Sequence, residues 1–304
     1  MSMMSCLPDL NHYIPLKSDT DRLAKCTKVC KQYSNEDERV VKWLRDEFIA
    51  SVANDFSWRC RYDKKENPLR MIGVASGTGV IEMSVISELL TVFPFIDVTV
   101  IEPCRESIDA YKALTEKRKL EFKGVSWNWC QETFQTFSQR NSDRFDFICA
   151  IHALYFSPLS ELKEQLLTLH EMLDDGGIIF SLHDKGTTCL QQFEKLFPDV
   201  NHPLRPSINS DLIKSSLKEL SFSYRTIGEL ETNIEATECL IPGSEDGSCL
   251  LDAFIQVVGF TKLSKSDEVQ LVQDFLKTEE VSFCLEGRWF VDMSVEMIVI
   301  NSLK

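Results

Sequence analysis

Short apolar runs alternate with amphipathic segments through the middle of the chain. Four runs have the length and composition of buried strands, at 70–75, 97–101, 146–151 and 177–182. Between them lie three segments whose apolar residues recur at helical spacing, at 80–92, 107–114 and 161–173. Strands that alternate with helices of this length form parallel sheets with helices on both faces. The pattern therefore predicts an α/β, doubly wound, mostly parallel sheet.

The region before this alternation is helical in pattern. Residues 35–56 repeat apolar side chains near every 3.6 positions, which predicts a helix. Asn35 is its candidate N-cap, and Glu36 stands in the first turn, where the helix dipole favours an acid. A polar stretch at 64–68 then separates this helix from the first strand.

The last third of the chain is only partly regular. Residues 211–220 predict a helix, 223–227 a strand and 293–300 a final strand rich in β-branched residues, whereas 228–290 contain a polar turn and two short helical stretches. We expect one domain over 1–304, with a helical cap, a cofactor-binding core, and a substrate-side insertion that precedes the final strand. These three parts are predicted at 1–66, 67–227 and 228–304.

A turn with two glycines joins the first predicted strand to the first predicted helix. Gly77 and Gly79 permit backbone angles and a close ligand approach that a side chain would block, although two glycines can also mark only a tight turn. The amides at the start of the helix suit a polar ligand group. The next strand ends in Glu102, and an acid at this position accepts hydrogen bonds from ribose hydroxyls in nucleotide-binding folds. The alternative for Glu102 is a solvated carboxylate at a strand end.

The glycine spacing separates two cofactor classes. Glu82 stands near the place where the dinucleotide fingerprint has its third glycine, which disfavours NAD. A shorter glycine pattern followed by a strand that ends in Glu resembles the class I methyltransferases. The segment 173–177, Leu-Asp-Asp-Gly-Gly, is similar to a helix-to-strand turn of that superfamily. This resemblance implies a Rossmann-like methyltransferase sheet and S-adenosyl-L-methionine as the cofactor.

Charge and cysteine content restrict the partners. With 33 basic and 47 acidic residues the net charge is −14, which disfavours binding to nucleic acid and to anionic membranes. No stretch approaches the roughly 20 apolar residues of a membrane span. Cys26 and Cys30 have no histidines spaced to complete a metal site, so we expect no metal. Eleven cysteines without a CxxC pair indicate thiols in a reducing compartment, so we expect the protein in the cytosol. We also expect it to be a monomer.

Along nearly its whole length the chain resembles the histamine N-methyltransferase family. The matching stretches are 34–36, Ser-Asn-Glu; 77–79, Gly-Thr-Gly; 100–103, Val-Ile-Glu-Pro; 146–148, Asp-Phe-Ile; 154–156, Leu-Tyr-Phe; 246–254, which contains Asp-Gly, Leu-Leu and Phe254; and 298–300, Ile-Val-Ile. The resemblance implies transfer of a methyl group to a nitrogen of a small amine or imidazole. It also adds Ala75, Ser107 and Ile151 to the predicted donor site.

The same resemblance implies roles at the acceptor site. Glu36 matches a glutamate of the cap that contacts the substrate amine or imidazole, and a carboxylate pairs well with such a group. Tyr155 and Phe156 match a tyrosine pair, with the second hydroxyl lost, and Phe254 matches an aromatic that closes the amine pocket. Core packing is the alternative for all three aromatics, and a helix-start charge is the alternative for Glu36.

The predicted pocket departs from the family at several positions. His152 replaces an amide side chain, Met293 replaces an asparagine that helps to bind the ring nitrogen, and two pocket tryptophans fall near Thr187 and Gln191. In the comparison with the family, Arg205 falls close to the position of a pocket-lining cysteine. There its guanidinium could hold a substrate carboxylate or simply face solvent. We expect His152 to accept a proton from the substrate or to hydrogen-bond it; a histidine satisfied by backbone contacts is the alternative.

These departures leave more than one function open. The first is an N-methyltransferase of a small amine or imidazole. The second is a methyltransferase of another small molecule, such as a carnosine-like imidazole dipeptide, an amino acid or a phenol. The third is a non-catalytic homologue that keeps the fold and the cofactor.

Overall fold

The computed structural model describes residues 10–52, 65–155, 158–197 and 207–301. They belong to two compact units, each assembled from three stretches of chain. Unit 1 comprises Met1–Glu36, Asp184–Asn209 and Leu230–Val295; unit 2 comprises Asp37–His183, Ser210–Glu229 and Glu296–Lys304. The prediction of a single domain over 1–304 stays a prediction.

Unit 2 contains a seven-stranded sheet with the order β3-β2-β1-β4-β5-β10-β6. Its strands are β1 Leu69–Val74, β2 Ile96–Ile101, β3 Val125–Cys130, β4 Phe145–Ile151, β5 Leu173–Asp184, β6 Tyr224–Leu230 and β10 Val295–Asn301. The first five strands in this order pair in parallel. Backbone hydrogen bonds join Lys185 to Ser294 and Asn301 to Ser223, so β10 begins where β5 ends and ends where β6 begins. The strand β10 is therefore antiparallel to both neighbours.

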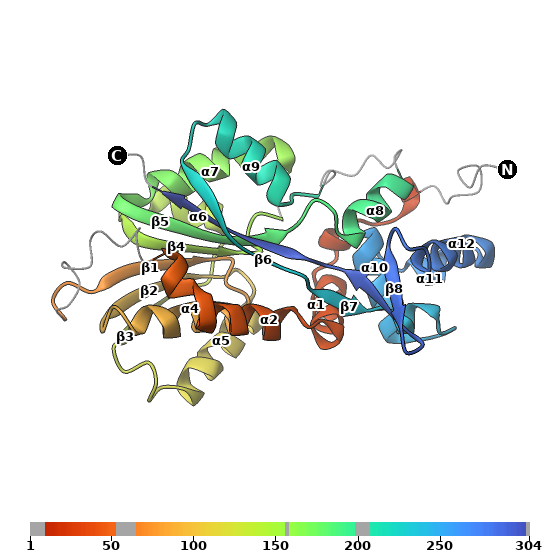
Figure 1. Ribbon diagram of the computed structural model, residues 1–304, viewed down its shortest axis with the longest axis horizontal. Coiled ribbons are helices and arrows are strands. Elements are labelled where there is room, and N and C mark those ends of the chain that lie inside the picture. Colours follow the sequence, from red (N-terminus) through yellow and green to blue (C-terminus); the bar gives the residue numbers. More distant parts are fainter. Residues whose placement is uncertain (1–9, 53–64, 156–157, 198–206, 302–304) are drawn as a thin grey trace. The chain divides into compact units, whose positions relative to one another are not determined.

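Helices cover both faces of this sheet, with α4 and α5 on one side and α7 and α9 on the other (Figure 1). The helices of unit 2 are α2 Glu36–Trp43, η4 Leu44–Phe48, α3 Ile49–Val52, α4 Val80–Leu90, α5 Arg105–Lys117, α6 Phe134–Arg140, η6 Leu159–Glu161, α7 Leu162–Glu171 and α9 Ser210–Glu219. Phe48 of η4 packs edge-on against Phe147 and Phe180, on β4 and β5. Phe48, an apolar position of the helix predicted at 35–56, thus packs on the sheet.

The register of the parallel strands aligns their carboxyl ends. Val74, the last residue of β1, pairs with Ile101, the last residue of β2. Ile151, the last residue of β4, pairs with Leu182 of β5. In open α/β sheets, ligands bind outside these carboxyl ends, at the point where the strand order reverses. Here the chain moves outward from β1 to β2 and β3, and then back to β4 and β5 on the other side of β1.

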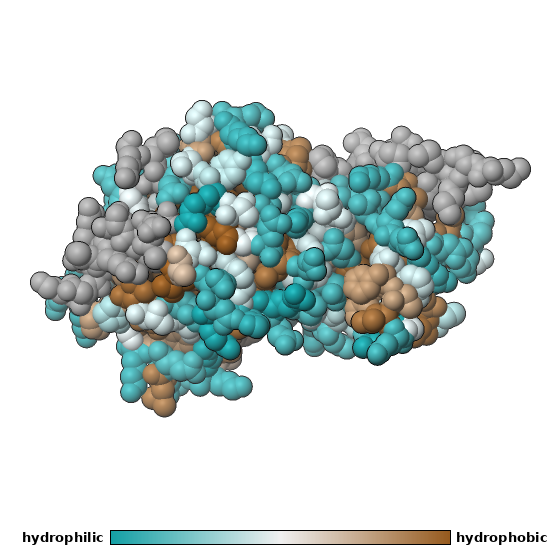
Figure 2. Space-filling view, in the orientation of Figure 1, coloured by the Kyte–Doolittle hydropathy of each residue, from teal (hydrophilic) through white to brown (hydrophobic). Residues whose placement is uncertain are grey.

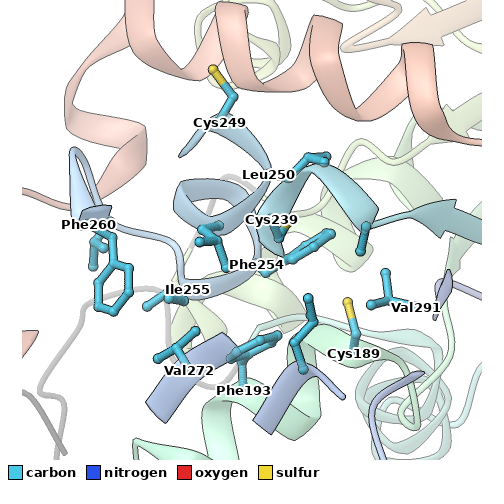
Figure 3. Close-up of a cluster of buried hydrophobic side chains, with 14 of the residues drawn as sticks. Cys189, Phe193, Cys239, Cys249, Leu250, Phe254, Ile255, Phe260, Val272 and Val291 are labelled. Atoms are coloured by element: carbon cyan, nitrogen blue, oxygen red, sulfur yellow. The ribbon is translucent and has the colours of Figure 1, made fainter. Parts of the chain in front are cut away.

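Unit 1 combines helices with a three-stranded antiparallel sheet of order β7-β9-β8. Its elements are η2 Leu10–His12, η3 Leu16–Ser18, α1 Thr20–Tyr33, α8 Cys189–Leu196, β7 Asn233–Glu235, η7 Thr237–Leu240, α10 Glu245–Ile255, α11 Phe260–Leu263, α12 Ser266–Leu276, β8 Ser282–Leu285 and β9 Arg288–Asp292. Its core gathers Phe193, Phe254 and Phe260 with aliphatic and cysteine side chains, and α10 runs through it (Figure 3).

The predicted fold class is confirmed. The strands predicted in the middle of the chain, near residues 223–227 and at the end are all present within a few residues. The sequence pattern did not predict β3, α6, α8 or the small sheet of unit 1. Asn35 directly precedes α2, and its side-chain oxygen accepts a hydrogen bond from Asn233 N–H at 2.9 Å, beside β7; its role as an N-cap stays a prediction. The Glu36 amide donates instead to Ser34 Oγ at 3.0 Å.

Hydrophilic residues cover most of the visible surface (Figure 2). A brown group stands out over the β8–β9 hairpin, where Phe283 and Leu285 are 49% and 55% exposed. Among the residues described, no helix has both the length and the apolar composition that crossing a bilayer requires.

Candidate functional site

The predicted donor turn lies between β1 and α4, at the carboxyl edge of the sheet. Ala75, Gly77 and Gly79 all have positive φ, at 50°, 54° and 74°. A Cβ at Gly77 would meet no atom within 4 Å, so a ligand has open access to the backbone there. A Cβ at Gly79 would lie 2.3 Å from the ring of Tyr111, so this glycine is required by packing and by conformation. The two glycines therefore serve different purposes.

Glu102 is held directly beside this turn. Its Oε2 accepts the Gly77 amide at 2.8 Å, and its Oε1 accepts the Cys104 amide at 2.8 Å. The residue is 6% exposed. A carboxylate oxygen can accept two hydrogen bonds, so each one keeps capacity for a further donor such as a ribose hydroxyl. The turn and the carboxylate therefore fit a nucleoside-containing cofactor.

Glu82, noted in the sequence only as a missing glycine, is part of the same structure. It is 3% exposed, and Tyr111 donates from its hydroxyl to Glu82 Oε1 at 3.0 Å. A Cβ at Gly73 would lie 2.3 Å from both carboxyl oxygens, so the glycine in β1 makes room for this acid. The pKa of Glu82 is raised to about 7, mainly by burial and also by the charge of Glu102, against hydrogen bonds from Ser76 and Tyr111 that lower it. The sequence signal that could have revealed this buried acid is a polar residue within an otherwise apolar helix.

Two further residues of the predicted donor site border the same edge. Ser107 is half-buried in the first turn of α5, which begins three residues after Glu102. Ile151 is half-buried at the end of β4. The structure thus brings every predicted donor residue to the carboxyl ends of β1, β2 and β4, and their contact with the donor stays a prediction.

His152 directly follows β4 and has a backbone φ of 51°. Its amide donates to the Leu182 carbonyl at 2.9 Å, which anchors it to β5. Its Nδ1 lies 2.8 Å from the Tyr155 hydroxyl, and the two rings are 5.3 Å apart. The predicted proton acceptor and the predicted tyrosine wall are therefore hydrogen-bonded to each other. The ring of Tyr155 also packs edge-on against His183, a residue that the sequence analysis did not select.

The remaining described acceptor residues belong to unit 1. Glu36 is half-buried, and the β-bridge between Ser34 and Ile234 fixes the chain next to it. Met293 places its Sδ 3.3 Å from Cys189 Sγ, and its amide donates to the Thr232 carbonyl at 2.9 Å. The prediction that Glu36 and His152 face one pocket joins residues of the two units and stays a prediction.

Phe254 lies in the hydrophobic core of unit 1, 2% exposed (Figure 3). Its ring stacks on Phe193 with centroids 6.1 Å apart and planes 16° apart. Phe254 therefore has the core packing that was the alternative interpretation of this residue. Its role as a wall of the acceptor pocket stays a prediction. Phe156 and Arg205 lie outside the described residues.

A separate cavity of about 240 Å³ occurs in unit 1, at the start of α10. Its lining includes Glu238, Ser244, Lys262 and Gln273, and none of the predicted site residues. It is therefore not the predicted site.

Comparisons with known proteins agree with the sequence motifs. No protein-family model matches the chain. Histamine N-methyltransferase of Mus musculus is 23% identical over 252 residues, which cover 80% of this chain and 84% of that protein. Histamine N-methyltransferase A of Xenopus laevis is 24% identical over 302 residues, which cover 94% of this chain and 97% of that protein.

Solved structures share the arrangement only loosely. The plantazolicin methyltransferase BpumL in complex with SAH has a TM-score of 0.46 and 13% identity, over 94% of this chain and 92% of that one. The YcgJ protein from Bacillus subtilis has a TM-score of 0.49 and 12% identity, over 84% of this chain and 99% of that one.

The sheet order, the glycine turn after β1 and the acid at the end of β2 define a methyltransferase of the S-adenosyl-L-methionine-dependent, Rossmann-like class. Within this class, the chain is a remote homologue of the histamine N-methyltransferases just named, at 23% and 24% identity over most of its length.

Proposed function

We propose that this protein transfers a methyl group from S-adenosyl-L-methionine to a nitrogen of a small amine or imidazole. One observation carries the proposal: Glu102, Gly77 and the His152–Tyr155 pair stand at the aligned carboxyl ends of neighbouring strands. A donor on the first two would lie next to an acceptor on the pair. The similarity to histamine N-methyltransferases supports the choice of a nitrogen acceptor.

The donor-side residues would hold the cofactor by its sugar and by backbone contact. The open face at Gly77 admits close approach, and Glu102, fixed by two amides, would accept from ribose hydroxyls. When bound, S-adenosyl-L-methionine supplies a methyl carbon on a sulfonium, whose C–S bond breaks with its electron pair left on sulfur. Because the methyl is already activated, the main task of the protein is to orient the acceptor nitrogen.

The acceptor nitrogen must present a lone pair, and the acceptor loses one proton after the N–C bond has formed, from the same nitrogen in an amine and from the other ring nitrogen in an imidazole. His152 is the proposed proton acceptor. In the tautomer whose Nδ1–H donates to the Tyr155 oxygen, Nε2 keeps its lone pair and can take that proton or accept a hydrogen bond from the substrate. We propose that Glu36 and Met293 complete the acceptor site, with Phe254, Phe156 and Arg205 as its further predicted residues.

We also propose that the protein acts as a monomer in the cytosol and binds neither nucleic acid nor membranes. The net charge of −14 supports the last point. All nine cysteines in the described part of the chain are free thiols, which suits a reducing compartment.

The deciding test is transfer of a labelled methyl group to a panel of acceptors. The panel contains histamine, a primary amine, an imidazole dipeptide, an amino acid and a phenol, with a sample that lacks acceptor as control. We expect the label on histamine or on another amine or imidazole. Label only on the amino acid or the phenol would assign another substrate class. Donor binding without any transfer would instead identify a non-catalytic homologue.

The donor site is tested by Glu102→Ala. Removing a charged hydrogen-bond acceptor should weaken binding of S-adenosylhomocysteine by about 1–3 kcal/mol in titration calorimetry. The matched control is Glu106→Ala, four residues further on, where the side chain is exposed on α5. Equal affinities of the parent and of the Glu102→Ala variant would contradict the donor site.

A further inference from the structure

Glu82 lies directly beneath the turn that is proposed to bind the donor. Its carboxyl fills the space that a side chain at Gly73 in β1 would occupy, just before the turn begins at Ala75. The ring of Tyr111, whose hydroxyl donates to Glu82 Oε1 at 3.0 Å, fills the corresponding space at Gly79. The acid and its hydrogen-bond partner are therefore packed against the chain on both sides of the turn.

The groups that face the Glu82 carboxyl provide no positive charge. Among the described residues they are the hydroxyls of Ser76 and Tyr111, the thiol of Cys149 and the carboxylate of Glu102. Burial raises the pKa of the Tyr111 phenol and of the Cys149 thiol well above their usual values, so both groups stay neutral. Glu102 repels a second negative charge. A buried carboxylate normally has a cationic partner, so the ionised form of Glu82 lacks the charge that would stabilise it.

The methyl donor and its product differ by one charge. S-adenosyl-L-methionine has a positive sulfonium, and S-adenosylhomocysteine, which lacks the methyl group, has a neutral thioether in its place. In both ligands the sulfur is bonded to the carbon that leaves the ribose ring, so it is only a few bonds from the hydroxyls proposed to contact Glu102. Glu82 is close enough to Glu102 to be repelled by its charge. A charge on Glu82 therefore attracts the sulfonium and has little effect on the thioether.

We propose that Glu82 makes the donor site selective for the cationic donor over its neutral product. This inference rests on the donor site of the proposed function. When the carboxyl is ionised, the donor gains the attraction between its sulfonium and a buried negative charge, which water and salt screen little. The product gains no such attraction. Contacts that both ligands share cancel in the ratio of their affinities, so this ratio reports the charge.

The selectivity depends on pH. Raised mainly by burial, the pKa of Glu82 is about 7, so the carboxyl is protonated and neutral well below this pH. As the pH rises through about 7, the ionised fraction grows and the affinity for the donor increases relative to the affinity for the product. The coupling is reciprocal, so bound donor lowers the pKa of Glu82 and bound product does not. Loss of the sulfonium charge after transfer therefore favours release of the product.

The test measures the dissociation constants of both ligands, without acceptor, by titration calorimetry across the pH range around neutrality. Glu82→Gln keeps the shape of the side chain and loses its charge, and it shares with the parent the titration of the ligands' own amino groups. Relative to this variant, the ratio of donor to product affinity in the parent should increase roughly 3- to 30-fold from acid to alkaline pH.

Tyr111→Phe gives a second readout that a merely structural role would not change. It removes a hydrogen bond that lowers the pKa of Glu82, so the increase in the affinity ratio should move to higher pH. If Glu82→Gln binds neither ligand, this shift decides the question: a pH profile that Tyr111→Phe leaves in place would then overturn the inference.

The control is Glu106→Gln, which removes an exposed carboxylate of α5 and should follow the parent at every pH. Binding of the product reports that each variant is folded. Equal pH profiles of the affinity ratio in the parent and in Glu82→Gln would overturn the inference while the donor site stands. Parent protein that binds neither ligand would instead contradict the donor site itself, and with it the proposed function.

Discussion

Two non-glycine residues of the proposed site adopt left-handed backbone conformations. Ala75 has a φ of 50° in the donor turn, and His152 has a φ of 51° after β4. Such conformations cost of order 1–3 kcal/mol and persist only where the surroundings enforce them. Here the Leu182 carbonyl holds the His152 amide, and the Ile101 carbonyl holds the amide of Ser76. Both positions are therefore built into the sheet edge, as expected for residues that must present a precise geometry to ligands.

Glu82 gives a prediction at the same scale. Its pKa is about 7 in the folded protein, against 4.5 as the ordinary value, so the folded state binds the proton more tightly. The stability present below pH 4.5 is therefore lost as the pH rises through about 7, by roughly 3 kcal/mol in total. The groups that face this carboxyl are Ser76, Tyr111, Glu102 and Cys149.

Glu82→Gln removes this titration. In urea unfolding between pH 5 and 8, the variant should gain stability relative to the parent as the pH rises. Glu106→Gln, on the exposed face of α5, is the control and should run parallel to the parent. A constant difference between Glu82→Gln and the parent at every pH would contradict the assignment.

At the scale of elements, the two edges of the parallel sheet have different chemistry. At the amino edge, Arg70 of β1 donates to Asp146 of β4 from its backbone amide at 2.9 Å and from its guanidinium at 2.9 and 3.1 Å. These bonds hold β1 and β4 in register. Asp146 belongs to a stretch that resembles the histamine N-methyltransferase family. Its hydrogen bonds with Arg70 give this residue a structural role, which accounts for the match without a ligand. Because these strand-joining bonds lie at the amino edge, the carboxyl edge remains available for ligands.

The helices α1 and α10 are joined by one buried and one exposed ion pair. Arg22 contacts Asp252, whose side chain is 0% exposed and also accepts the amides of Gly259 and Phe260. Lys25 and Glu245 join the same helices with side chains 51% and 63% exposed. Asp252→Ala should therefore cost about 3–5 kcal/mol of unfolding free energy, whereas Glu245→Ala should cost much less, because water screens its exposed ion pair. Urea titrations of both variants, which act as controls for each other, measure the difference; similar losses would contradict the argument.

At the scale of the molecule, the charge of −14 predicts how salt affects substrate binding. An acidic protein attracts cationic acceptors over long range, and about 0.1 M salt screens charges beyond about 10 Å. The KM for a cationic acceptor such as histamine should rise severalfold between about 0.02 and 0.3 M salt. The KM for a neutral imidazole should stay nearly constant and serves as the control. Parallel changes for both acceptors would show that the net charge has no part in recognition.

Much of the sheet could be predicted because its strands have strong local patterns. The run at 146–151 is apolar throughout, and β4 is buried along nearly all its length. The strand β3 was missed because it lies at the sheet edge, where Trp127 and Trp129 alternate with exposed polar residues and no buried run results. In unit 1, α10 begins within the segment that the sequence pattern predicted as a polar turn. Ser244 caps this helix by accepting a hydrogen bond from the Gly247 amide.

By itself, the sequence determined four of the five parallel strands with the helices between them, the glycine turn, the acid at the end of β2 and the histidine that follows β4. These features depend on the periodicity and identity of residues close together in the chain. The tertiary structure alone decided that Glu82 lies under Gly73, that Phe254 belongs to the core of unit 1, and that His183 stands next to His152. Those relations come from the pairing and packing of segments far apart in the chain, and local patterns do not specify which segments meet.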